Sequence, residues 1–166
     1  ASEHAVESKI AAMQLLGAEV HLVPGGYGEA ELAGLEYARS NQALWISPYN
    51  DGQVIAGQGT LALEVLGSLP DDRDYTWIVP VGGGGLISGI GAALASLAPS
   101  HRVIGVQSEA SAFMHALLKR GSQEGVLDLP SLADGLSGPV ETGAVTIPLV
   151  RQYVHDIVLV TELEIK

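Results

Sequence analysis

Short apolar segments alternate with longer amphipathic segments along this chain. Five segments have the length and apolar character of strands: residues 19–23, 44–47, 75–81, 102–107 and 156–160. Apolar residues recur at steps of three and four, as in helices, over residues 5–16, 29–41, 54–69, 86–98 and 110–121. Apolar strands separated by helices are typical of a parallel sheet that is covered on both sides. The sequence therefore predicts an α/β fold: a parallel sheet with helices on both faces.

The length of 166 residues predicts a single α/β domain. Both ends look truncated. Thr161 and Glu164 have the spacing of a capping box that opens a helix, yet no helix is expected after them, and no strand precedes the first helix. The least regular segment, residues 122–143, is expected to be a long ordered connection.

Composition excludes several kinds of partner. With 8 Lys and Arg against 19 Asp and Glu, the formal charge is −11, which argues against nucleic acid and anionic membranes. No apolar run approaches the roughly 18 residues of a membrane span, and no targeting segment is recognised. The absence of cysteine excludes disulfides and thiolate metal sites. We expect a cytoplasmic protein.

Four consecutive glycines, Gly82 to Gly85, separate the strand that ends at Val81 from the helix that begins at Leu86. Glycine backbone can turn tightly and direct several N–H groups into one concavity, and the start of the helix adds unpaired N–H groups and a positive dipole end. The sequence therefore predicts an anion site that can hold a phosphate without a basic side chain. A tight turn packed against the sheet is the alternative.

Two kinds of nucleotide site can be compared with this run. A P-loop requires Gly-Lys-Ser/Thr, whereas Leu86 follows the glycines here, so ATP or GTP hydrolysis is not expected. A dinucleotide fingerprint is approximated by Gly83, Gly85 and Ser88. Glu109 follows the next strand, slightly beyond the usual position of a ribose-binding acid. A nicotinamide-dinucleotide-binding module therefore remains an alternative.

At these residues the chain resembles the fold type II pyridoxal-phosphate enzymes, specifically the threonine/serine dehydratase group, which is also similar to serine racemase. The resemblance is carried above all by Ala56-Gly57-Gln58-Gly59-Thr60 and by Pro80-Val81-Gly82-Gly83-Gly84-Gly85-Leu86. It also includes Ser47-Pro48-Tyr49-Asn50 and Ala133-Asp134-Gly135, and the matching stretches span nearly the whole chain in order.

The resemblance implies pyridoxal 5′-phosphate as cofactor and a lyase reaction, the β-elimination of a hydroxy amino acid to a 2-oxo acid. It implies cofactor contacts at Gly82, Gly83, Gly84, Gly85, Leu86 and Gly135. It also implies that residues 51–166 form the cofactor domain and that residues 1–50 contribute to or border the small domain. Pro48 and Tyr49 follow a predicted strand, so they could border the substrate pocket. The complete enzyme would take a small amino-acid substrate and form a homo-oligomer.

The catalytic lysine of this family, which holds the cofactor as a Schiff base, has no counterpart here. Lys9, Lys119 and Lys166 are interpreted as solvated surface charges. We therefore assign no catalytic residue and expect the chain alone to be inactive. The alternative is a non-catalytic, self-associating domain.

No metal site is expected either. The positions that resemble the metal ligands of some relatives carry Gln107, Ser111 and Phe113, which supply no carboxylate. The five histidines are scattered without paired helical spacing.

Overall fold

The computed structural model describes residues 1–70 and 73–166, which fall into two compact units, Ala1–Ile46 and Ser47–Lys166. Within the first unit, α1 spans Glu7–Leu15 and α2 spans Tyr27–Ser40. The Glu29 carboxylate accepts a hydrogen bond from the Gly26 N–H at the start of α2 (2.9 Å). Trp45 packs against Gly34 of α2, where a β-carbon would lie 2.7 Å from its ring.

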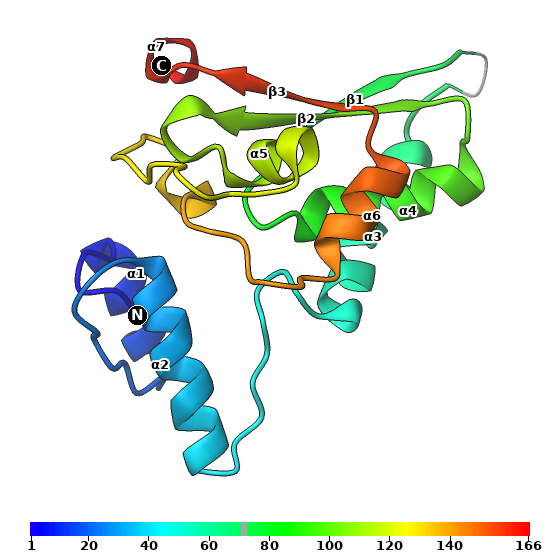
Figure 1. Ribbon diagram of the computed structural model, residues 1–166. Helices are drawn as coiled ribbons and strands as arrows, with labels where there is room; N and C mark the ends of the chain where they lie inside the picture. The colour runs from blue at the N-terminus through cyan, green and yellow to red at the C-terminus, as the bar shows by residue number, and fades with distance from the viewer. Residues whose placement is uncertain (71–72) are drawn as a thin grey trace. The chain divides into compact units, whose positions relative to one another are not determined.

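The second unit contains a three-stranded parallel sheet in the order β1-β2-β3 (Figure 1). The strands are β1 (Thr76–Pro80), β2 (Arg102–Ser108) and β3 (Asp156–Val160). The helical elements are α3 (Gly52–Leu66), α4 (Gly85–Leu97), η1 (Glu109–Ser111), α5 (Phe113–Arg120), η2 (Asp134–Leu136), α6 (Thr146–Tyr153) and α7 (Glu162–Ile165). Because the strands are parallel, the segments that follow all three begin at the same edge of the sheet.

One face of the sheet carries the core. Figure 1 shows α4, α5 and α6 on the same side of the sheet, with α3 packed against α4. Val79, Val103 and Ile157 point into this layer and are buried, as are Ile87 and Ile90 of α4. On the opposite face, Ile78 is 63% exposed and Val158 is 42% exposed. The helices of the described residues therefore cover one face of the sheet, whereas the sequence predicted helices on both faces; the apolar character of the strands did not reveal which face is covered.

The backbones of α3 and α4 approach each other closely at two glycines. A β-carbon on Gly89 would lie 2.3 Å from the carbonyl oxygen of Ile55 and 2.6 Å from the backbone nitrogen of Gly59. On the other helix, a β-carbon on Gly59 would lie 2.9 Å from the Gly89 carbonyl oxygen. Neither helix can carry a side chain at this contact, which explains the glycines in both segments.

The α/β class and the parallel sheet are confirmed, as are the five predicted helices and three of the five predicted strands, with shifted ends. The helix predicted over residues 110–121 is divided into η1 and α5. Two short helices were not predicted. The helix α6 contains Pro148, which its first turn tolerates because the missing N–H has no intrahelical acceptor there. The helix α7 follows Thr161, which caps it as a capping box with Glu164, although no helix was expected there.

The strands predicted at residues 19–23 and 44–47 are wrong. Val23 makes a single isolated bridge with Ser2, and residues 44–47 belong to no strand. Leu44 is 85% exposed and Ile46 is 62% exposed. Apolar composition alone gave these predictions, but a strand also requires a neighbouring strand to receive its hydrogen bonds, and the described residues provide none here.

Substituting Gly89→Ala tests the contact between α3 and α4. We expect it to destabilise the chain by about 3 kcal/mol or more, because the added methyl group meets backbone atoms that cannot rotate away. The matched control is Gly57→Ala, also in a helix, where a β-carbon would meet nothing within 4 Å. The control is expected to stabilise the chain by about 0.5–1 kcal/mol. Urea unfolding followed by circular dichroism measures both; equal effects would contradict the close helix contact.

Candidate functional site

The four glycines Gly82 to Gly85 form a loop, called the glycine loop below. It lies between β1 and α4, at the carboxyl edge of the sheet. The Val81 N–H donates to the Val106 carbonyl (2.8 Å), which carries the sheet pairing one residue beyond β1. The chain then turns at Gly84, whose φ of 90° is in the left-handed region. Side chains rarely adopt this conformation, so glycine is required at this position. The turn directs the chain into α4 at Gly85.

The backbone N–H groups of this loop are the polar feature of the site. Ser88 is the first residue of α4 whose N–H finds a backbone acceptor, the Gly84 carbonyl at 3.0 Å. Within residues 1–70 and 73–166, the hydrogen bonds leave the N–H groups of residues 82–86 without an acceptor. Unpaired N–H groups at the positive end of a helix dipole attract anions. This arrangement is what the sequence predicts for a phosphate site.

The aromatic ring of Tyr49 covers one side of the loop. A β-carbon on Gly83 would lie 2.4–2.6 Å from carbon atoms of this ring, and one on Gly85 would lie 2.9 Å from the Tyr49 α-carbon. Tyr49 is only 8% exposed. It therefore lies on the loop backbone rather than on the protein surface, and the sequence did not predict this contact with the glycines.

The other side of the loop contacts α5 and α6. A β-carbon on Gly84 would meet Met114 of α5, together with Thr146 and Val150 of α6, at 2.8–3.2 Å. The fully buried Thr146 hydroxyl donates to the Gly83 carbonyl (2.7 Å). Sequence reasoning missed Thr146, because no motif surrounds it and its helix was not predicted. Packing and one hydrogen bond thus hold the loop from this side.

The segment that contains Gly135 also reaches the loop. A β-carbon on Gly82 would lie 3.0 Å from the Leu136 carbonyl oxygen. Gly135 is exposed, and it lies in η2 immediately before Leu136. The residue that follows Gly135 therefore contacts the glycine loop, although the two segments are about 50 positions apart in sequence. Its contact with a cofactor ring stays a prediction.

The carboxylate of Glu162 ties this same segment to the carboxyl edge of the sheet. Its Oε1 accepts hydrogen bonds from the hydroxyls of Ser131 (2.6 Å) and Ser108 (2.8 Å), and its Oε2 accepts one from the Leu132 N–H (2.8 Å). These hydrogen bonds lower the pKa of the Glu162 carboxyl from its ordinary value of 4.5, and the hydrogen bond from Ser131 has the largest effect. The capping box drew attention to Thr161 and Glu164, but nothing in the sequence indicated this role of Glu162.

The unit that contains the glycine loop carries two lysines, Lys119 and Lys166. Lys119 pairs with Asp156 (3.0 Å), which begins β3 and therefore lies at the edge of the sheet opposite the loop. Lys166 is the last residue and is exposed. Lys9 lies in α1, in the other unit. The structure thus gives Lys119 an ordinary ion pair rather than a position against the glycine loop.

The three positions considered for a metal are buried. The Gln107 Oε1 accepts from the His115 N–H (2.9 Å), and its Nε2 has no hydrogen-bond partner among the described residues. The Ser111 hydroxyl donates to Asp128 (2.8 Å), and Phe113 is packed in the core. Among the residues that the structure describes, no group of three or more His, Asp or Glu side chains could hold a metal ion. The absence of a metal here stays a prediction.

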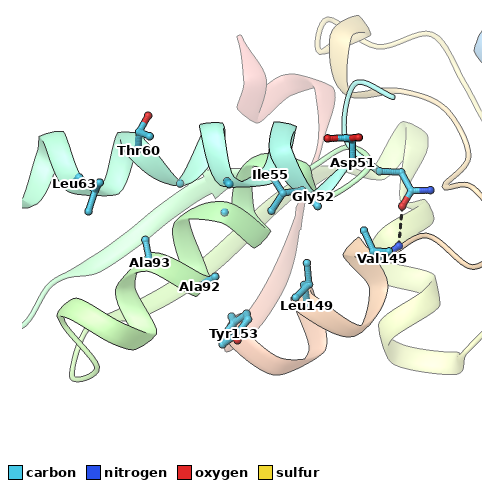
Figure 2. A pocket seen from close by; sticks show the side chains of 14 residues that line it. Asp51, Gly52, Ile55, Thr60, Leu63, Ala92, Ala93, Val145, Leu149 and Tyr153 are labelled. Carbon is cyan, nitrogen blue, oxygen red and sulfur yellow. Dashed lines mark hydrogen bonds between the residues drawn. The ribbon is translucent and has the colours of Figure 1, made fainter. Parts of the chain in front are cut away.

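A separate apolar groove of about 710 Å³ lies among α3, α4 and α6. Figure 2 shows Ile55, Ala92, Leu149 and Tyr153 around it, with the hydrogen bond from the Val145 N–H to the Asn50 side chain at one end. The glycines of the loop do not line this groove. The groove and the loop are therefore different features of the second unit.

An α/β unit with a glycine-rich loop at the carboxyl edge of a parallel sheet occurs in several enzyme classes, and comparison with known proteins identifies the class here. The sequence profile of the pyridoxal-phosphate dependent enzymes matches residues 1–166, so the chain belongs to this family. Membership favours the pyridoxal-phosphate interpretation over the dinucleotide alternative.

Individual relatives are similar along almost the whole chain. L-threonine ammonia-lyase of Thermotoga maritima is 45% identical over 158 residues, 95% of this chain and 39% of the relative. The catabolic L-threonine dehydratase TdcB of Escherichia coli K12 is 42% identical over 164 residues, 98% of this chain and 48% of the relative. The chain therefore spans less than half of either relative.

Solved structures show the same fold. Processed threonine deaminase isoform 2 of Solanum lycopersicum has a TM-score of 0.80 at 30% identity, covering 96% of this chain and 46% of that protein. Maize serine racemase has a TM-score of 0.81 at 29% identity, covering 99% of this chain and 49% of that protein. These similarities confirm the resemblance that the sequence motifs indicated. No helix among the described residues is long and apolar enough to cross a membrane.

Substituting Thr146→Val tests how the loop is held. Valine keeps the shape of threonine but leaves the Gly83 carbonyl without its donor, so we expect a loss of about 1–2 kcal/mol in unfolding free energy. The control is Thr60→Val, whose exposed hydroxyl donates to the Gly57 carbonyl of its own helix (2.8 Å) and should change stability by less than about 0.5 kcal/mol. Urea unfolding compares them. A Thr146 variant as stable as its control would show that the hydroxyl does not hold the loop.

Substituting Ser131→Ala should raise the pKa of Glu162 toward 4.5, because the largest of the hydrogen bonds that stabilise the carboxylate is lost. In the parent chain, a pKa lowered by folding contributes stability that is complete above the unfolded value of 4.5 and is lost as the pH falls through the lower folded value. Carboxyl carbon NMR during an acid titration measures this pKa. Ser68→Ala, whose hydroxyl donates to the Glu64 carbonyl (3.3 Å) and not to Glu162, serves as the control and should leave the Glu162 curve unchanged.

Proposed function

We propose that this chain provides the phosphate-binding part of a pyridoxal-phosphate dependent threonine ammonia-lyase, with the N–H groups of Gly82, Gly83, Gly84, Gly85 and Leu86 as ligands of the cofactor phosphate. One observation carries the proposal: these five N–H groups lack an acceptor among the described residues at the start of α4. Similarity to the L-threonine ammonia-lyase and dehydratase relatives supports the reaction class.

The residues present suit the phosphate of this cofactor. The loop offers several N–H donors and the positive end of α4, and a phosphate ester is bound well by such donors in a protein with few basic side chains. Gly135 is proposed to lie against the cofactor ring, where the lack of a side chain leaves space. Bound pyridoxal phosphate stabilises negative charge at the α-carbon of an amino acid. The part of this chain is to bind and orient the phosphate end of the cofactor.

Three further points stay proposals. Residues 51–166 would form the cofactor domain and residues 1–50 would contribute to or border the small domain; the division of the chain at Ile46–Ser47 supports this boundary. The substrate would be a hydroxy amino acid such as L-threonine or L-serine. A homo-oligomer in the cytoplasm is proposed for the complete enzyme.

Titration of the ¹⁵N-labelled chain with pyridoxal phosphate, and separately with inorganic phosphate, tests the phosphate site. We expect both ligands to shift the backbone amide signals of residues 82–86, because hydrogen bonding to an anion changes the environment of each N–H. The amide of Gly57, an exposed helical residue of α3, is the internal control and should not move. Unmoved loop signals at saturating ligand would refute the proposal.

The same sample addresses catalysis. Since the chain has no counterpart of the family's catalytic lysine motif, we expect the chain with pyridoxal phosphate and L-threonine to form no 2-oxo acid. Steady 2-oxo acid formation would show that one of its own three lysines, Lys9, Lys119 or Lys166, can serve the reaction, and would overturn the proposal that the chain alone is inactive.

A further inference from the structure

Tyr49 has two contacts that together connect the glycine loop to a distant part of the chain. Its ring lies against Gly83, 2.4–2.6 Å from where a β-carbon on Gly83 would be, and its α-carbon lies 2.9 Å from where one on Gly85 would be. Its hydroxyl oxygen accepts a hydrogen bond from the backbone N–H of Glu141 (2.8 Å). The ring is thus fixed at both ends, by the loop and by a residue 92 positions away.

The Glu141 side chain fixes the same two segments to each other a second time. Its carboxylate accepts hydrogen bonds from the Ser47 hydroxyl (3.1 Å) and from the Asn50 amide (2.6 Å). The Asn50 oxygen in turn accepts one from the Val145 N–H (2.8 Å), the bond drawn in Figure 2. Four hydrogen bonds therefore join residues 47–50 to residues 141–145, and we call this set the Tyr49 clamp.

The residue that follows the clamp also contacts the loop. Thr146 follows Val145, and its hydroxyl donates to the Gly83 carbonyl (2.7 Å). Residues 141–146 therefore hold Gly83 in two ways, through the Tyr49 ring on one side and through Thr146 on the other. A peptide group held from both sides cannot rotate freely, so the directions of the neighbouring N–H groups are set before any anion arrives.

We propose that Tyr49 is a positioning residue for the phosphate loop: its hydroxyl, anchored on the Glu141 N–H, fixes its ring against Gly83 and so orients the N–H donors of the loop. This inference rests on the proposed phosphate site. Donors that are already oriented bind an anion without the entropic cost of ordering the loop. Packing alone would keep a ring at this place, whereas the hydroxyl fixes its angle and depth.

Substituting Tyr49→Phe tests the inference, since it removes the hydroxyl and leaves the ring. We expect binding of inorganic phosphate, measured by amide shifts, to weaken about threefold to tenfold, the effect of one lost hydrogen bond. Before any ligand is added, the amide signals of Gly83 and Gly85 should already move, because ring currents depend on the ring position. The control is Tyr75→Phe, whose hydroxyl donates to the Pro70 carbonyl (3.3 Å) before β1 begins and should leave phosphate affinity unchanged.

Glu141→Gln provides a second variant if the first does not fold. Glutamine keeps the backbone N–H but replaces one acceptor oxygen by an amide that cannot accept from Ser47 or Asn50, so the clamp loosens without a change at Tyr49 itself. We expect the same direction of change as for Tyr49→Phe: a weaker phosphate affinity and shifted amide signals of Gly83 and Gly85.

The outcomes separate the two proposals. If the parent chain binds phosphate and both variants bind it as tightly with unmoved glycine signals, the positioning role is refuted and the phosphate site stands. If the parent chain shows no shift at residues 82–86, the phosphate site is refuted and the positioning role with it. Weaker binding in the Tyr49 and Glu141 variants alone, with the Tyr75 variant unchanged, supports the inference.

Discussion

The structure depends on the exclusion of side chains from the backbone between β1 and α4. At Gly83 and Gly85 the place of a β-carbon is taken by Tyr49, and at Gly89 it is taken by the backbone of α3. Other atoms therefore occupy the places where side chains would lie on the loop and on the start of α4. The groups of the loop that remain available for hydrogen bonds are its N–H groups. Backbone N–H groups without partners are costly, so a loop built this way favours an anion. Steric crowding and the unpaired N–H groups are therefore two results of the same glycines.

Segments that are far apart in sequence meet at the carboxyl edge of the sheet. The loop follows β1, Ser108 ends β2, and Glu162 begins α7 after β3. Glu162 connects the last two strands to residues 131–132, and Leu136 of the same connection lies against Gly82. The long connection between α5 and α6 contains only the short η2 and is held by these side-chain hydrogen bonds. In α/β proteins, ligands bind at this edge, and here the edge is also where the connections are tied together.

Sequence reasoning was most successful where the pattern was local. The alternation of apolar segments predicted the class and the parallel sheet, and the four glycines predicted the turn between β1 and α4. It failed at residues 19–23 and 44–47, since apolar composition does not reveal whether a neighbouring strand exists. It also missed Thr146 and Glu162, because a hydroxyl or a carboxylate that bonds to a residue tens of positions away leaves no periodic signal. The place of Tyr49 on the loop was beyond reach for the same reason.

The way the loop is enclosed has a consequence for co-translational folding on the ribosome. Tyr49, which covers one side of the loop, is synthesised before the glycines, whereas Thr146, on the other side, follows them by more than 60 positions. Contacts of such long sequence separation form late, because a large stretch of chain must be brought together before they stabilise anything. When the ribosome has synthesised the glycines but not yet Thr146, the loop is therefore an open turn that lacks its contact with α6. The loop is enclosed on both sides only after the start of α6 has left the exit tunnel, so the proposed phosphate site is completed late in synthesis.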